Sequence, residues 1–158
     1  MKHSRIWQTL IAAVVICGML LGSVWAAESA TKEECVQKCK EAAALFQDKG
    51  MDEAVKQINN PKGPFVWKDS YVFCVDLASV SNIAHPFNQT SLGMSLLMIK
   101  DANGKMFYSE FVKTAKEQGE GWVTYMWPKP GESAPSTKMA YILQVPDTQY
   151  AMVAGTYE

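Results

Sequence analysis

Residues 121–128 have the sequence GWVTYMWP, and this segment gives the clearest indication of the architecture. Bulky strand-forming residues dominate it, and side chains alternate between the two faces of a strand, so Tyr125 and Trp127 are predicted to share one face. Two more strand candidates follow at residues 138–145 and 150–156, each after a proline-containing turn. The end of the chain is therefore predicted to form antiparallel strands.

Upstream of this segment the apolar pattern has a helical period, and before that a strand period. Residues 106–115 place apolar side chains three and four positions apart, which predicts an amphipathic helix that ends near Gly119 and crosses one face of the sheet. Residues 71–76 alternate as a strand, and a short strand is predicted around residues 83–85. A loop over residues 86–93 then leads toward the helix.

The first part of the domain is predicted to be helical. Thr31 and Glu34 have the spacing of a capping box, and apolar residues from Cys35 to Phe46 recur on one helix face. Gly50 ends this helix, and a second short helix covers residues 51–58. This order of elements predicts an α+β fold with a long N-terminal helix packed on a mostly antiparallel sheet of five to six strands.

Residues 1–26 have the pattern of a signal peptide, with a basic start before an apolar run from Leu10 to Leu21. Cleavage is predicted after Ala26, which leaves residues 27–158 as a single domain that is periplasmic or secreted; an uncleaved anchor is the alternative. Loss of the two basic residues in this segment leaves an excess of three acidic charges with no basic stripe. Nucleic acid is therefore not an expected partner.

Six short motifs occur in order along the predicted mature chain. They are NPKGPF at 60–65, YVF at 71–73, AHP at 84–86, DANGK at 101–105, GWVTYMWP at 121–128 and GTY at 155–157. In this succession the chain resembles the single Cache domain type 2 family (sCache_2). The resemblance implies a PAS-like extracytoplasmic sensor domain with a small-molecule pocket on its sheet, for ligands that are often short carboxylates. It also implies a membrane receptor or sensor kinase as partner. Since no second membrane segment or signalling domain is recognised, the chain is expected to act through a separate partner or only to bind.

The residues expected to contact the ligand combine one cation with aromatic side chains. They are Lys138, Tyr125, Trp127, His85, Tyr71 and Tyr141. A buried carboxylate needs a fixed donor, and the resemblance implies that Lys138 faces the pocket; the alternative is an outward-facing lysine on an edge strand. His85 would make binding pH-dependent near neutrality, or else it braces the loop that begins at Pro86. The aromatic residues would supply a wall and phenolic donors, or fill the core.

Two other functions remain open. The first is metal capture by Cys35, Cys39 and Cys74, with His85 as a fourth ligand; thiols that fill the core, or a bridge between Cys35 and Cys39, are the alternatives. The second is a protein-interaction role, in which the stripe from Cys35 to Phe46 pairs with a partner or a second copy as a homodimer. No nucleophile elbow, Walker motif, dinucleotide glycine motif or zinc-protease motif occurs, so no enzyme and no cofactor are predicted.

Overall fold

The computed structural model describes residues 28–158, and the predicted signal peptide lies outside them. The elements in chain order are α1 (Lys32–Lys49), α2 (Met51–Ile58), β1 (Val66–Trp67), β2 (Ser70–Asp76), β3 (Ser81–Ala84), the 3-10 helix η1 (Gln89–Ser91), α3 (Phe107–Gln118), β4 (Glu120–Pro128), β5 (Pro135–Gln144) and β6 (Tyr150–Tyr157). The predicted α+β class is confirmed. In the described residues, the helices are too short or too polar to cross a membrane.

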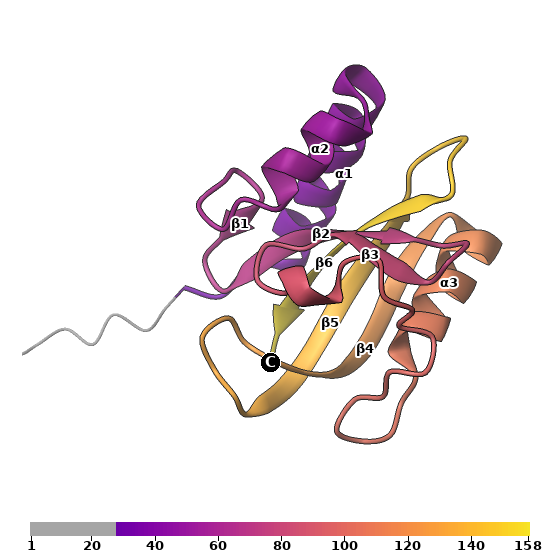
Figure 1. The fold of residues 1–158 in the computed structure, drawn as a ribbon. Helices are drawn as coiled ribbons and strands as arrows, with labels where there is room; N and C mark the ends of the chain where they lie inside the picture. The colour runs from indigo at the N-terminus through magenta and orange to yellow at the C-terminus, as the bar shows by residue number, and fades with distance from the viewer. Residues whose placement is uncertain (1–27) are drawn as a thin grey trace, which may run out of the picture.

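The six strands form one sheet that places the end of the chain at its centre. The strand order is β1-β2-β6-β5-β4, and β3 pairs with β2 outside this order. Every strand pairing is antiparallel. Figure 1 shows β6 and β5 between β2 and β4. Both are therefore interior strands, hydrogen-bonded on their two edges.

Helices cover both faces of this sheet. Helix α1 packs on β6, β5 and β2 with α2 beside it, whereas α3 packs on β4 and β5 (Figure 1). Alternate residues of β2 belong to different clusters: Tyr71, Phe73 and Val75 pack with the aromatic residues of α3, and Val72 and Cys74 pack beneath α1. We call these two sides the aromatic face and the α1 face. The predicted alternation of β2 is confirmed.

Local signals set the helix boundaries as predicted. The Thr31 side chain accepts a hydrogen bond from the backbone N–H of Glu34, whose carboxylate accepts from the N–H of Thr31, so the capping box is complete. Gly50 and Gly119 follow α1 and α3 with φ of 83° and 78°, a left-handed conformation that favours glycine. The pattern missed β1 and η1, because two- and three-residue elements have no period to detect.

Candidate functional site

Lys138 is completely buried in β5. Its Nζ has no hydrogen-bond partner and lies 4.2 Å from the ring centroid of Tyr71, 5.0 Å from that of Tyr157 and 5.8 Å from that of Phe73. Cation–π contacts offset part of the lost hydration of an ammonium group but leave its N–H donors unused. Because β5 is an interior strand, the alternative of an outward-facing lysine on an edge strand is wrong.

Gly155 of β6 makes room for the Lys138 side chain. A Cβ atom on Gly155 would lie 2.6 Å from Lys138 Cε, which is closer than real Cβ atoms approach, and 3.0 Å from its Cγ, which is unusually tight. The Ser70 hydroxyl donates to the Gly155 carbonyl at 2.7 Å and fixes the neighbouring strand. The backbone oxygen of Met139 would lie 2.9 Å from the same Cβ atom, so a larger residue at position 155 would require both the lysine stem and the neighbouring strand to shift.

His85 is a hydrogen-bond acceptor that organises the loop after β3. Its Nδ1 accepts from the backbone N–H groups of Phe87 and Asn88 at 3.2 and 3.0 Å, so the proton of the neutral ring is on Nε2. Burial, together with the nearby positive charge of Lys138, lowers the pKa of His85 to about 3. The bracing role is confirmed. The prediction that His85 titrates near neutrality is wrong, because a second proton would break both hydrogen bonds.

A cavity of about 210 Å³ lies beside this cluster. Its walls are Tyr71, His85, Phe87, Asn88, Trp127 and the β4–β5 turn from Pro128 to Glu132. Lys138 is not in the wall, but the Tyr71 ring both lines the cavity and contacts the lysine ammonium. Tyr71 therefore connects the open cavity to the buried cation, and the volume suits a ligand of few atoms.

The other two predicted residues lie apart from the cavity. Tyr125 is on the aromatic face as predicted, but its ring stacks on Phe107 with 4.2 Å between centroids, and burial raises the pKa of its hydroxyl. Tyr141 is on the α1 face, where its hydroxyl donates to Glu120. Lys138 and Tyr141 are three positions apart in one strand and so point to opposite faces. The structure thus brings together Lys138, Tyr71, His85 and Trp127, places Tyr125 on the same face but outside the cavity wall, and separates Tyr141 from them.

The three cysteines fill the core of the α1 face. Cys35, Cys39 and Cys74 are buried and unpaired, and burial raises the pKa of each thiol. His85 packs against the rings of Tyr71 and Phe73 on the aromatic face. No group of three His, Cys, Asp or Glu side chains within residues 28–158 could hold a metal ion. The three thiols share the α1 face, and the sheet separates them from His85, so the proposed set of three thiols and one imidazole is not brought together and the metal-capture hypothesis is wrong.

The apolar stripe of α1 is covered by the sheet. Cys35, Cys39 and Ala42 are completely buried, and Phe46 packs against Tyr150 of β6 with 5.4 Å between ring centroids. The stripe is therefore occupied within the domain. The stripe itself is not free to pair with a partner or a second copy, and a homodimer through the N-terminal helix, which would use the outer face of α1, stays a prediction.

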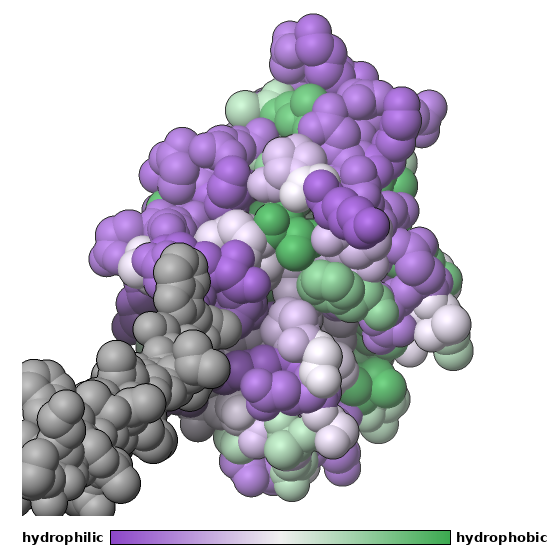
Figure 2. Space-filling model, turned by 90° about the vertical axis from the view of Figure 1, so that its left-hand side faces the viewer, coloured by the Kyte–Doolittle hydropathy of each residue, from purple (hydrophilic) through white to green (hydrophobic). Residues whose placement is uncertain are grey.

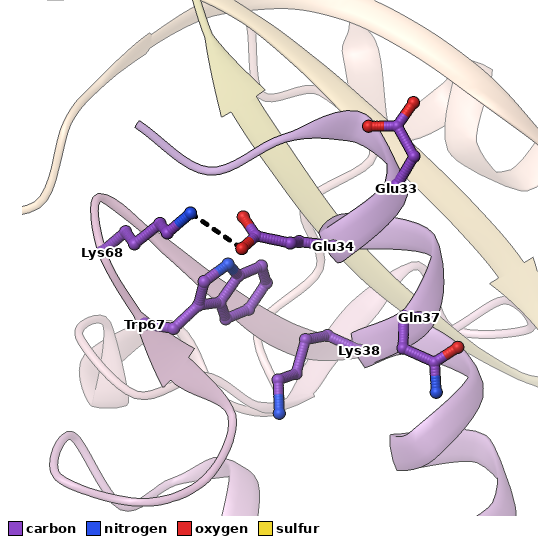
Figure 3. Close-up of a pocket in the computed structure, with 6 residues that line it drawn as sticks. All are labelled: Glu33, Glu34, Gln37, Lys38, Trp67 and Lys68. Atoms are coloured by element: carbon purple, nitrogen blue, oxygen red, sulfur yellow. Dashed lines mark hydrogen bonds and ion pairs between the residues drawn. The ribbon is translucent and has the colours of Figure 1, made fainter. Parts of the chain in front are cut away.

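A larger hollow of about 530 Å³ lies between α1 and β1. Figure 3 shows its lining residues: Glu33, Glu34, Gln37, Lys38, Trp67 and Lys68. Lys68 pairs with Glu34 and Glu28 at 2.7 and 3.0 Å, and the surrounding face is mostly hydrophilic (Figure 2). Its unpartnered buried donor is the neutral indole N–H of Trp67, which is less costly to leave unpaired than an ammonium group. The cluster around Lys138 is therefore the stronger candidate site.

Two residues of the site were not predicted from the sequence. Tyr157 pairs with Lys138 in the β5–β6 register, and its hydroxyl donates to the Pro128 carbonyl at 2.9 Å. Lys129 lies in the β4–β5 turn, lines the cavity and places its Nζ 5.7 Å from the Tyr157 ring centroid. Tyr157 is two positions after Gly155 and shares its face of the strand, so strand alternation could have indicated it from the sequence. Lys129 reaches the cavity only through the fold of its turn, which no sequence pattern indicates.

The architecture and the site define a PAS-like sensor domain, in which helices cover a central antiparallel sheet and a small cavity lies on one of its faces. The family described as Single Cache domain 2 matches residues 36–158, and the chain belongs to this family. The predicted resemblance is confirmed.

Comparison with curated proteins finds a chemoreceptor. The chain is 29% identical over 170 residues to the methyl-accepting chemotaxis protein McpP of Pseudomonas putida (strain KT2440), in an alignment that covers 97% of this chain and 31% of that protein. The chain thus spans about a third of the length of this relative.

Solved structures of sensor domains are similar over most of their length. A periplasmic sensor domain of a chemotaxis protein is 26% identical, with a TM-score of 0.64 over 79% of this chain and 88% of that one. A Cache chemosensory domain, solved to explain carboxylic acid recognition, is 28% identical, with a TM-score of 0.63 over 79% and 86% of the two chains. The chain is therefore a Cache sensor domain of the extracytoplasmic type found in chemotaxis proteins.

Proposed function

We propose that this domain binds a short organic acid at Lys138, in the periplasm or outside the cell, and reports it through a separate membrane receptor or sensor kinase. The observation that carries the proposal is the completely buried Lys138 ammonium, which has no hydrogen-bond partner. Carboxylic acid recognition by a related Cache domain supports the choice of ligand class.

The physical argument starts from the cost of an unpaired buried charge. An ammonium group without an anion or hydrogen-bond acceptor is unfavourable in the interior, and a ligand carboxylate would supply both. The rings of Tyr71, Phe73 and Tyr157 exclude water around it and so strengthen a charge-assisted hydrogen bond. Because the Tyr71 ring joins the cavity to Lys138, the ligand enters the cavity and this ring shifts as the carboxylate reaches Nζ.

The size of the site sets the expected affinity. With a ceiling of about 1.5 kcal/mol per heavy atom, a four-atom acid such as acetate reaches about 6 kcal/mol, or a Kd of tens of micromolar. The role is binding rather than catalysis, since the site's imidazole is held neutral with Nδ1 engaged by two backbone groups. A weak, fast equilibrium of this kind suits a sensor.

Thermal melting tests the proposal. The panel is acetate, propionate, pyruvate, lactate and succinate, with acetamide and propionamide as uncharged analogues of the same shape. We expect at least one acid to raise the Tm of the wild type, since it binds only the folded state, and the amides to leave the Tm unchanged. Lys138→Met should abolish the rise in Tm. The control Lys116→Met, which removes an exposed lysine, should show the same rise as the wild type.

Lys138→Met also has a diagnostic effect on stability. Removing an unpartnered buried cation while keeping the side-chain volume should leave the unliganded protein as stable as the wild type or more stable by about 1–2 kcal/mol. A wild type that no acid stabilises, or a Lys138→Met variant that responds to the acid like the wild type, would overturn the proposal.

A further inference from the structure

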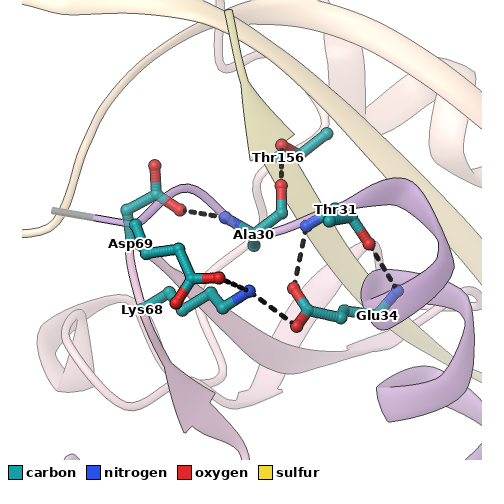
Figure 4. A network of polar contacts seen from close by, with 7 residues as sticks. Ala30, Thr31, Glu34, Lys68, Asp69 and Thr156 are labelled. Atoms are coloured by element: carbon teal, nitrogen blue, oxygen red, sulfur yellow. Dashed lines mark hydrogen bonds and ion pairs between the residues drawn. The ribbon is translucent and has the colours of Figure 1, made fainter. Parts of the chain in front are cut away.

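A polar network fastens the first described residues to the sheet, and Figure 4 shows its members. The Ala30 N–H donates to Asp69 Oδ1 at 2.7 Å, and the Ala30 carbonyl accepts from the Thr156 hydroxyl. Lys68 links Glu28 and Glu34 from the other side. Residues 28–34 are thus held between the start of β2 and the end of β6.

Asp69 belongs both to this network and to the mouth of the cavity. Its Oδ2 lies 3.8 Å from the Nζ of Lys129, a cavity-lining residue of the β4–β5 turn. The Asp69 side chain is only 10% exposed and that of Lys129 is 27% exposed. One carboxylate therefore holds the backbone of Ala30 with one oxygen and the cation of the cavity mouth with the other.

The Lys129–Asp69 pair is weak and exchangeable. A separation of 3.8 Å is too long for a hydrogen bond, and partly exposed ion pairs contribute about 0.2–1 kcal/mol. The Lys129 ammonium also lies over the Tyr157 ring, which contacts Lys138, so the two cations of the site adjoin the same side chain. Glu132 is the other ionisable residue of the turn that lines the cavity. Its carboxylate would repel a bound anion, so an acid in the cavity should lie closer to Lys129 than to Glu132.

We propose that Lys129 is a second ligand-binding residue, which exchanges Asp69 for the carboxylate of a bound acid and thereby loosens the hold of Asp69 on Ala30. This inference rests on the proposed function and adds a route from the cavity to residues 28–34. Once Lys129 turns to the ligand, the partly buried Asp69 carboxylate loses its counter-charge and is drawn toward water, so its hydrogen bond to Ala30 weakens.

Linkage makes the inference testable in both directions. If Asp69 competes with the acid for Lys129, then Asp69→Asn should bind the acid about two- to fivefold more tightly, the range that a partly exposed ion pair allows. Asn keeps an amide oxygen for the Ala30 N–H. Lys129→Gln should bind the acid more weakly by a similar or larger factor. Lys68→Gln is the matched control, since it removes a lysine of the same network that does not line the cavity, and its affinity should equal that of the wild type.

The measurements are calorimetric titration of each variant with the acid that stabilises the wild type, and hydrogen exchange of the Ala30 amide by NMR. In the wild type, saturating acid should accelerate Ala30 exchange about two- to fivefold, and in Asp69→Asn it should not. If the wild type binds acid but Asp69→Asn binds no more tightly and Ala30 exchange is unchanged, the inference fails and the proposed function stands. If no acid binds the wild type, both fail. Should Asp69→Asn not fold, Lys129→Gln decides alone, and an unchanged affinity overturns the inference.

Discussion

The two faces of the sheet are built from the same strands but differ in how completely their buried groups are paired. On the α1 face thiols and aliphatic side chains pack directly beneath the helix, with Cys39, Val72 and Met152 completely buried, and the aromatic side chains there are fewer and include Tyr141 and Phe46. The aromatic face contains interlocked rings, and among them a buried cation without a partner and a histidine held neutral. One face is packed for stability. The other keeps an unsatisfied charge beside a cavity, which is the local conflict expected of a binding site.

Replacement of a core ring on the aromatic face should give the largest stability change. Phe111 is completely buried and contacts the rings of Phe73, Phe107 and Tyr125, so Phe111→Ala should lower the free energy of unfolding by about 3–5 kcal/mol. The counterpart on the α1 face is the half-buried Phe46, where alanine should cost clearly less. Urea denaturation measures both; equal losses would show that the aromatic cluster is not the dominant core.

Burial of His85 on the aromatic face should make the free energy of unfolding depend on pH. Its pKa is about 3 in the folded protein and near the ordinary 6.5 in the unfolded chain. Between these two pH values only the unfolded chain binds the proton. The contribution of His85 to the stability of the folded protein is therefore complete above about pH 6.5 and decreases as the pH falls. The expected loss is about 1.4 kcal/mol per pH unit, or roughly 2–3 kcal/mol at pH 4.5.

The control for this prediction is His85→Asn, whose amide oxygen can accept from the same backbone groups but does not titrate. Subtracting the two pH profiles of unfolding free energy cancels the carboxylates that both proteins share. The difference should have a slope between pH 6.5 and 4 and none above pH 7. Parallel profiles would mean that His85 is protonated in the folded protein, in conflict with the bonds from Phe87 and Asn88 to its Nδ1.

On the α1 face a polar substitution should affect stability alone. Cys39→Ser places a hydroxyl in a completely buried apolar position and should cost about 1–3 kcal/mol. Cys39→Ala separates the effect of the hydroxyl from that of lost volume. Acid binding, followed by titration, should be unchanged in both variants because the sheet lies between this thiol and Lys138. Altered affinity would show that the two faces are coupled.

The sequence predicted the fold better than the site, and Lys138 shows the reason. Helix caps and strand alternation are local, so α1, α3 and β2 were predicted close to their observed bounds. Whether a lysine is buried depends on the strand order, which the pattern does not contain. Only the position of β5 between β4 and β6 excludes the edge-strand alternative.

Side-chain partners of distant segments were the least predictable part. Lys129 and Asp69 are 60 positions apart, and Asp69 had the local signature of a turn residue. Bracing of the loop is one of the two roles that the sequence leaves open for His85, but its low pKa depends on burial by rings from other strands and on the charge of Lys138. The prediction that Tyr141 belongs to the site is based on its residue type, because tyrosines suit a pocket, whereas its odd spacing from Lys138 indicates the opposite face.

The smallest expected effect is that of Tyr141→Phe, which tests directly whether Tyr141 lies on the face opposite to the ligand. The Tyr141 hydroxyl donates to Glu120 near the surface, so Tyr141→Phe should cost about 1 kcal/mol of unfolding free energy and leave acid binding unchanged. Tyr71→Phe is the matched change on the aromatic face, where the ring contacts Lys138 and lines the cavity, and it should weaken acid binding at least severalfold if its hydroxyl contacts the ligand. Titration of both variants decides. A loss of affinity in Tyr141→Phe alone would place the ligand on the α1 face, whereas a loss in Tyr71→Phe alone would place it on the aromatic face, beside the unpaired ammonium group of Lys138.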